Sequence, residues 1–120
     1  MDNKRVLVLK ESFDGIAKSA PEMGIYYWMA RDLMTFLGYA RWENFVEAVN
    51  RAKTACNTQG VDASHHFRDV TKTIDLPKGA HREIADVMLS RYACYLIAMN
   101  GDPRKEEIAF AQGLTPAPLL

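Results

Sequence analysis

Few residues of this chain have the types and spacing that catalysis requires. No P-loop, dinucleotide-binding fingerprint, nucleophile elbow or HExxH motif occurs in the sequence. His65 and His66 with Cys56 or His81 are conceivable zinc ligands. Adjacent histidines point in different directions, however, and no CxxC or HxxxH spacing supports such a site. We therefore expect no enzymatic activity, no metal and no cofactor.

The two cysteines do not change this expectation. Cys56 and Cys94 each lie within the apolar stripe of a predicted helix. Free cysteine is among the most buried residue types, and disulfides are uncommon inside cells. We interpret both as buried, inert thiols.

The other candidates are cations and an aromatic ring that could contact nucleic acid, and they form two groups. The first lies on the outer face of residues 41–53, where Arg41, Arg51 and Lys53 are mixed with acidic residues. The second, residues 72–82, sets three cations against Asp75 and is the most basic local surface of the chain. The predicted nucleic-acid-binding residues are Arg41, Trp42, Arg51, Lys53, Lys72, Lys78 and Arg82.

Overall composition neither demands nor forbids such binding. Fifteen Lys and Arg balance fifteen Asp and Glu, so any nucleic-acid contact must come from local patches. The chain has 120 residues, which predicts a single domain, and 48% of them are hydrophobic, as in ordinary soluble proteins. No stretch approaches the ~20 apolar residues of a membrane span, and no signal peptide is recognised. We expect a cytoplasmic protein without membrane contact.

The first group lies on a predicted pair of helices. Residues 30–37 form a compact helix that Gly38 ends, and Tyr39 to Arg41 form a turn. From Trp42 the apolar spacing predicts an amphipathic helix that ends between Asn57 and Gly60. Helix, glycine turn and longer helix is the outline of a helix-turn-helix, but it is also a common packing unit with no DNA role.

The second group lies on a predicted β-hairpin. Residues 61–66 are expected to form a loop or a single helical turn, and residues 67–76 alternate as a strand does. Residues 77–80 form a turn, and residues 83–89 return as a strand, although their spacing also suits a helix. A two-stranded ribbon with a cationic tip can enter a DNA groove. The alternative is a hairpin whose charges only keep it soluble.

The remaining elements complete an α+β fold. We expect a strand over residues 4–10, turns or loops at residues 14–15 and 19–24, and a strand over residues 25–28 that pairs with the first. Ser90 is a predicted N-cap for a helix that ends at Gly101, and Pro103 begins another that continues to Gln112. The predicted architecture is small antiparallel hairpins packed with a helix-turn-helix-like pair and a C-terminal helix pair.

The segment LSRYACYLIAMNGDPRKEEIAFAQ resembles the central signature of the DNA-damage-inducible protein D family of bacteria. Upstream, WMARDLMTFLGYARWENF, RAKTAC and HHF occur in the order and spacing of that family. The N-terminal region of the family is itself similar to the BRO-N antirepressor domains of phages and large DNA viruses. The resemblance covers residues 25–112, so we expect a BRO-N-like domain over residues 1–112 and a frayed tail over residues 113–120.

The resemblance implies a function. The family is induced in the SOS response and is associated with DNA damage and with control of RecA recombinase filaments, whereas related antirepressor domains bind DNA or repressors. We expect a non-enzymatic protein whose domain binds single- or double-stranded DNA and modulates recombinase filaments or transcription. The candidate protein partners are a RecA-type recombinase and a repressor. The alternative is an antirepressor-like protein interaction module without direct DNA contact.

The sequence departs from the family pattern after Gln112. Family members continue with an aromatic helix and a further, largely helical region, whereas this chain turns to Gly113-Leu114-Thr115-Pro116. We expect a truncated or frameshifted copy, or a small free-standing version. A helix severed here would leave apolar surface near residues 92–97 uncovered, so we also expect that a homodimer can form.

Overall fold

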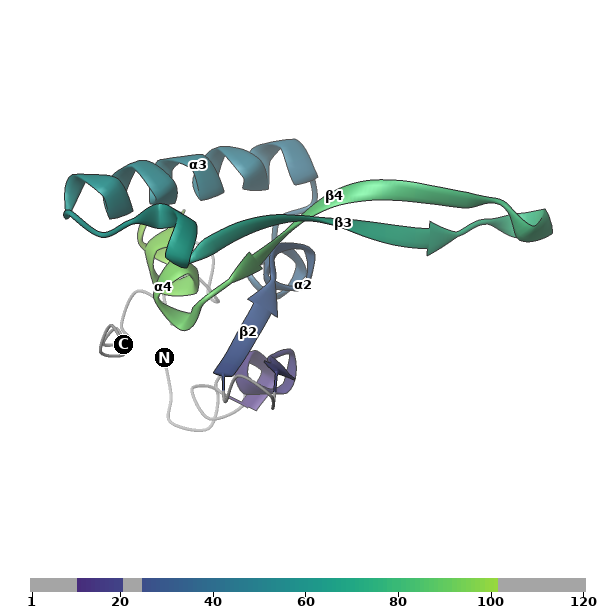
Figure 1. Ribbon diagram of the computed structural model, residues 1–120, viewed down its shortest axis with the longest axis horizontal. Coiled ribbons are helices and arrows are strands. Elements are labelled where there is room, and N and C mark those ends of the chain that lie inside the picture. The colour runs from purple at the N-terminus through teal and green to yellow at the C-terminus, as the bar shows by residue number, and fades with distance from the viewer. Residues whose placement is uncertain (1–10, 21–24, 102–120) are drawn as a thin grey trace.

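The described part of the chain forms a four-stranded antiparallel sheet covered by helices (Figure 1). The computed structural model describes residues 11–20 and 25–101. In chain order the elements are β1 (Lys18–Ala20), β2 (Ile25–Met29), α2 (Ala30–Phe36), α3 (Trp42–Thr58), η2 (Ala63–His65), β3 (Phe67–Asp75), η3 (Pro77–Gly79), β4 (His81–Leu89) and α4 (Arg91–Met99). The strands lie in the order β1-β2-β4-β3. The expected α+β class is confirmed.

The core lies where α3 and α4 pack together and against the sheet (Figure 1). Phe45 of α3, Ile97 of α4 and Leu89 of β4 are each at most 1% exposed. Within α3 the buried residues Phe45, Val49, Ala52 and Cys56 recur at the spacing that places them on one side of a helix. The predicted apolar face of α4 is confirmed, since Tyr92, Ala93, Leu96 and Ile97 are all buried.

Local signals define the helix boundaries close to where they were predicted. The Ser90 side chain accepts a hydrogen bond from the Ala93 amide at 3.0 Å and caps α4. Gly38 follows α2 with a φ of 82°, a left-handed conformation that residues with a Cβ rarely adopt. The helix-turn-helix outline is therefore present as α2, a short turn and α3, with boundaries within about a turn of the expected ones.

The hairpin of β3 and β4 is the longest pairing in the sheet. Its register runs from Phe67 opposite Leu89 to Asp75 opposite His81, which confirms the strand interpretation of residues 83–89 over the helical one. The first strand ends at Asp75 rather than Leu76. Figure 1 shows the hairpin extending well past the ends of α2 and α3. We call residues 71–85 the arm, and the remaining described residues the body.

The arm has almost no burial of its own. Ile74 and Ile84 are half-buried, and every other residue from 71 to 85 is exposed. The body contacts β4 next to the arm, where β2 pairs with it through Trp28 opposite Leu89 and Met29 opposite Met88. The arm is therefore held by its own strand pairing rather than by packing against the body.

The N-terminal expectations are partly wrong. Residues 11–15 are helical, so the turn predicted at Asp14-Gly15 does not form there. The apolar side chain of Phe13 explains this: it is 7% exposed and stacks on the Trp28 ring with centroids 4.7 Å apart. The predicted strand over residues 25–28 is confirmed as β2.

The partner of β2 also differs from the expectation. Lys18, Ser19 and Ala20 form β1 and pair with Tyr27, Tyr26 and Ile25, although Ser19 and Ala20 were expected in a loop. The strand predicted over residues 4–10, the loop over 21–24, the helix over 103–112 and the tail lie outside the described residues. Both described neighbours of β2, β1 and β4, are antiparallel to it.

Candidate nucleic-acid interface

The arm has two chemically different faces. Residues directly opposite in an antiparallel pair share a face, and successive residues of a strand alternate between faces. Lys72 lies opposite Ile84, and Ile74 lies opposite Arg82. These four side chains therefore share one face, which we call the basic face. The alternation predicted from the sequence, with Lys72 among apolar residues, is confirmed by this register.

The other face of the arm is acidic. It carries Thr71 opposite Ala85, Thr73 opposite Glu83 and Asp75 opposite His81. The Nδ1 atom of His81 lies 2.8 Å from the Asp75 carboxylate, so this pair makes its own contact. An anionic partner would be attracted to the basic face and repelled by the Glu83 side of the ribbon.

A further cation stands at the tip of the arm. Lys78 has a φ of 64° and is followed by Gly79 with a φ of 77°. Glycine and asparagine adopt this left-handed conformation more easily than lysine. An unfavourable backbone that carries a long cationic side chain at an exposed turn is the kind of feature that selection for binding, rather than for stability, would retain.

The arm cations have no partner within the described part of the protein. The side chains of Lys72, Lys78 and Arg82 are exposed and form no salt bridge or hydrogen bond with the described residues. Arg68 of β3, four residues before Lys72, is also exposed and lies on the same side of the sheet as Lys72. Arg68 was not predicted from the sequence. It could have been, because residues four apart on a strand lie on the same face and Lys72 was already a candidate.

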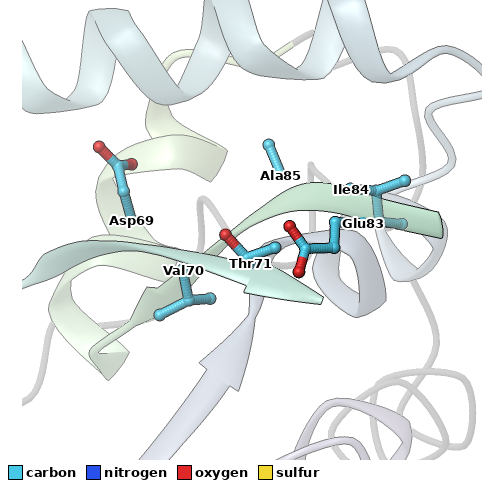
Figure 2. Close-up of a pocket in the computed structure, with 6 residues that line it drawn as sticks. All are labelled: Asp69, Val70, Thr71, Glu83, Ile84 and Ala85. Carbon is cyan, nitrogen blue, oxygen red and sulfur yellow. The ribbon is translucent and has the colours of Figure 1, made fainter. Parts of the chain in front are cut away.

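A shallow hollow lies where the arm joins the body (Figure 2). Its lining comes from both strands: Asp69, Val70, Thr71, Glu83, Ile84 and Ala85. Figure 2 shows the side chains of Asp69 and Val70 pointing to opposite sides of β3, as strand alternation requires. Two carboxylates line the hollow, so it does not suit a phosphate and leaves the basic face as the better anion-binding surface.

The predicted cations of α3 differ from those of the arm because two of them already contact the protein. A terminal nitrogen of Arg51 donates a hydrogen bond to the Asn100 carbonyl at 3.2 Å, next to the end of α4. The Lys53 ammonium lies 3.7 Å from the carboxylate of Asp69 on β3. Arg41 is exposed at the start of α3.

Trp42 is half-buried, and one face of its ring is covered by another side chain of the protein. The guanidinium of Arg31 lies 4.1 Å from the ring centroid of Trp42, a cation–π contact within the protein. Trp42 also lies beside Phe45, with ring centroids 6.1 Å apart. Of the seven predicted residues, three on α3 contact the body through their side chains, Arg41 at the N-cap of α3 is exposed, and three lie on the arm.

Asp86 connects the base of the arm to the body. It is 1% exposed, and its Oδ1 accepts hydrogen bonds from the Arg31 amide at 3.1 Å and from the Val87 amide at 2.8 Å. Met29, which precedes α2, provides no side-chain cap. Asp86 thus caps a helix from a strand 55 residues further along the chain. The Arg31 side chain adds a hydrogen bond to the Ala85 carbonyl at 2.8 Å.

The histidines do not gather into a metal site. No group of three or more His, Cys, Asp or Glu side chains among residues 11–20 and 25–101 is arranged to hold a metal ion. His65 lies 3.8 Å from the Asp62 carboxylate, and His66 lies 2.7 Å from the Ser90 hydroxyl. His66 also packs edge-on against the Tyr92 ring. Burial lowers the pKa of His66, and the nearby His65 adds to this effect.

Both cysteines are free and buried, as expected. Burial raises the pKa of the Cys94 thiol, and it also raises the pKa of Cys56, with a further contribution from Asp62. The Cys56 thiol donates a weak hydrogen bond to the Val61 carbonyl at 3.5 Å. A thiol held in its protonated form is a poor nucleophile, which agrees with a structural role. None of the described helices is both long and apolar enough to cross a bilayer.

Comparison with known proteins agrees with the resemblance seen in the sequence. The chain is 40% identical over 89 residues to DNA damage-inducible protein D of Escherichia coli (strain K12), an alignment that covers 74% of this chain and 32% of that protein. The aligned part thus spans about a third of the length of that relative. No solved structure matches the chain significantly. Residues 18–114, which include both α3 and the arm, match the BRO family, N-terminal domain, and the chain therefore belongs to this family.

Proposed function

We propose that this protein acts in the response to DNA damage by binding DNA through the arm, without catalysing a reaction. The observation that carries the proposal is an arm that projects from the body and whose cationic side chains have no ionic or hydrogen-bond partner among the described residues. Lysine and arginine side chains on an exposed ribbon are suited to contacts with phosphates. The name of the similar Escherichia coli protein refers to DNA damage, and this supports the biological setting.

The proposal extends to what bound DNA would do. A protein that occupies DNA where a recombinase filament assembles, or where a repressor binds, changes that assembly by competing for the same sites. We therefore propose that the domain modulates recombinase filaments or transcription through its DNA contact, with a RecA-type recombinase or a repressor as the affected partner. The protein would act in the cytoplasm, where bacterial DNA and the proteins that bind it are found.

The second candidate function is a protein interaction module that needs no DNA. Two observations favour it: the net charge of zero, and the strand edges of the arm. Beyond the pairing with β2, the outer edge of β4 has no described neighbour in the sheet, and β3 is an edge strand. An extended peptide from another protein can add a strand to such an edge.

The test is a titration of the full chain against labelled oligonucleotides, followed by fluorescence anisotropy. We expect binding that weakens strongly between about 50 and 200 mM salt, because phosphate contacts release counterions. A variant in which residues 72–84 are replaced by Asn-Gly, between the opposed residues Thr71 and Ala85, should retain the circular dichroism of a folded body and lose at least ~10-fold in affinity.

Charge variants test the arm independently of the deletion, which could fail to fold. Lys78→Glu with Arg82→Glu should weaken binding by a similar factor, whereas Arg51→Ala with Lys53→Ala should change it much less. Equal losses in both pairs would contradict the assignment to the arm. Absence of any salt-sensitive DNA binding by the folded protein would overturn the proposed function, and a protein partner retained at high salt after nuclease treatment would favour the second candidate.

A further inference from the structure

The chemistry of the arm indicates which kind of nucleic acid it binds, provided that the proposed function holds. We propose that the arm enters the major groove of double-stranded DNA with its basic face toward the base pairs, and that it discriminates against single strands. Four observations carry this inference: the width of the arm, its lack of aromatic side chains, the arrangement of cations and isoleucines on one face, and the acidic character of the other.

The dimensions of the arm suit a groove. Two paired strands lie about 4.8 Å apart, and the major groove of B-form DNA, about 12 Å wide and 8.5 Å deep, admits a two-stranded ribbon. From Thr71 to Asp75 and from His81 to Ala85 the arm consists of two strands and a tight turn. The helices α2 and α3 end before this region begins in Figure 1, so they do not broaden it.

The composition of the arm argues against single-stranded DNA. Proteins that bind single strands stack the bases on aromatic side chains, and each stacked base contributes about 1–3 kcal/mol. The arm, which the structure describes completely, contains no Phe, Tyr or Trp between residues 71 and 85. Within the body, Phe13 stacks on Trp28, and Tyr39 packs edge-on against Phe45. Tyr26 is 70% exposed, but it lies on β2 opposite Ser19 of β1 and is not part of the arm.

The basic face can make both kinds of contact that a groove offers. Lys72 and Arg82 alternate with Ile84 and Ile74 across the ribbon, so each cation has an isoleucine directly opposite it. In the major groove, lysine and arginine donate to guanine O6 and N7, and apolar side chains contact the methyl group of thymine. Lys78 at the tip, and Arg68 nearer the body, can reach phosphates beyond the contacted base pairs.

The acidic face fixes the orientation. With the basic face toward the base pairs, Asp75 and Glu83 point out of the groove and into solvent. The opposite orientation would place both carboxylates against base edges and between two rows of phosphates, which is electrostatically unfavourable. The ribbon therefore fits a duplex in one orientation. A flexible single strand has no groove and would not favour one face of the ribbon in this way.

The first experiment compares nucleic-acid forms. The full chain is titrated against one sequence as duplex DNA, as single-stranded DNA and as duplex RNA, whose deep and narrow major groove side chains cannot read. We expect duplex DNA to bind at least ~10-fold more tightly than the other two forms, because groove contacts add to the phosphate attraction that all three forms share. Equal or tighter binding of single strands would overturn the inference and leave the proposed function intact. Equal binding of duplex RNA would overturn the assignment to the major groove.

The second experiment compares the two faces with matched changes of charge. Lys72→Gln with Arg82→Gln, and Thr71→Glu with Thr73→Glu, both lower the net charge by two at neighbouring positions of the same ribbon. The first pair should lower affinity for duplex DNA at least ~10-fold with little change in the slope of log K against log salt, because the two side chains contact base edges rather than phosphates. The second pair should have a clearly smaller effect. Equal effects of the two pairs would show that the arm acts through its overall charge and would overturn the orientation.

Discussion

The body and the arm of this domain use charged residues in opposite ways. In the body, Arg31, Asp86 and Arg51 each make a hydrogen bond that joins two elements of structure. In the arm, the side chains of Lys72, Lys78 and Arg82 form no salt bridge or hydrogen bond with the described residues. Charged groups that connect elements mainly affect folding, whereas exposed and unpaired ones are available to a partner. The comparison predicts that stability and binding can be changed separately.

The body is also much more buried than the arm. The described part of the body contains a continuous cluster that joins β2, β4, α2, α3 and α4, while the arm contains two half-buried isoleucines. Two-stranded ribbons are only marginally stable in isolation, so the arm depends on the body to keep its strands in register. Binding to DNA would in turn order the arm, because a ligand that binds the ordered form stabilises it.

The largest expected effect is on the stability of the body. Phe45→Ala should lower the free energy of unfolding by about 3–5 kcal/mol, because Phe45 is 0% exposed and the body cannot fill the space it leaves. The matched change in the arm, Ile74→Ala, should cost less than about 1 kcal/mol, since half-buried side chains lose less contact area. Urea denaturation followed by circular dichroism measures both. Comparable losses would show that Ile74 contributes to folding as much as a buried residue of the body does.

The connection between body and arm gives the next largest effect. Asp86→Ala should lower the free energy of unfolding by about 2 kcal/mol, because it leaves the Arg31 and Val87 amides without an acceptor. Asp86→Asn keeps an oxygen in the position of Oδ1 and should cost distinctly less. Urea denaturation of the two variants is the measurement, and an Asn variant as unstable as the Ala variant would contradict capping through that oxygen.

Much of this arrangement could be predicted from the sequence, and the successes have a common basis. Ser90, Gly38 and the apolar face of α4 are local signals, since each acts within one turn of helix. The alternation of β3 also predicted the two faces of the arm, because strand geometry alone decides which neighbours share a side. The position of Lys72, Lys78 and Arg82 on one hairpin followed from these local patterns.

The errors arise where distant parts of the chain decide the outcome. Residues 14–15 contain a turn signal, but Phe13 packs on Trp28, and this contact favours a helical turn. Ser19 and Ala20 have no strand pattern and become β1 because β2 offers them a free edge. The cap that Asp86 provides for α2 was equally invisible, since its partner is 55 residues away.

The contact of Arg31 with Trp42 shows the same principle within the candidate site. The sequence places Arg41 next to Trp42, whereas the fold brings Arg31 of α2 over the ring. Arg51 and Lys53 occupy the exposed side of α3 as predicted, and the sequence contains no sign that Asn100 and Asp69 lie within their reach. Their role at DNA stays a prediction that the charge variants test.

Acid should weaken the body through His66. The pKa of His66 is lowered by burial, so the folded state binds a proton there less readily than the unfolded chain does. The free energy of unfolding should therefore fall as the pH drops below about 6.5, the ordinary value for histidine, toward the lowered pKa. Ser90 accepts a hydrogen bond from Ala93 and has its own proton to donate to a neutral His66 ring.

Urea denaturation at several pH values between about 5 and 8 measures this dependence, since unfolding free energies follow the difference in bound protons. His66→Gln, which cannot titrate, should show a smaller fall in stability over the same range. An unchanged pH dependence in this variant would show that His66 is not the group responsible.

The smallest expected effect concerns the tip of the arm, and there stability and binding should change in opposite directions. Lys78→Asn replaces a residue that rarely adopts the φ of 64° with one that adopts it readily. The free energy of unfolding should therefore rise slightly, by about a few tenths of a kcal/mol. The same change removes a cation, so affinity for duplex DNA should fall and the salt slope should decrease by about 0.9. Lys78→Arg is the matched control, which retains both the charge and the backbone strain. If Lys78→Asn instead bound DNA as well as the unmodified protein, the lysine at this strained position would have no part in DNA binding, and the contact would have to lie further along the basic face.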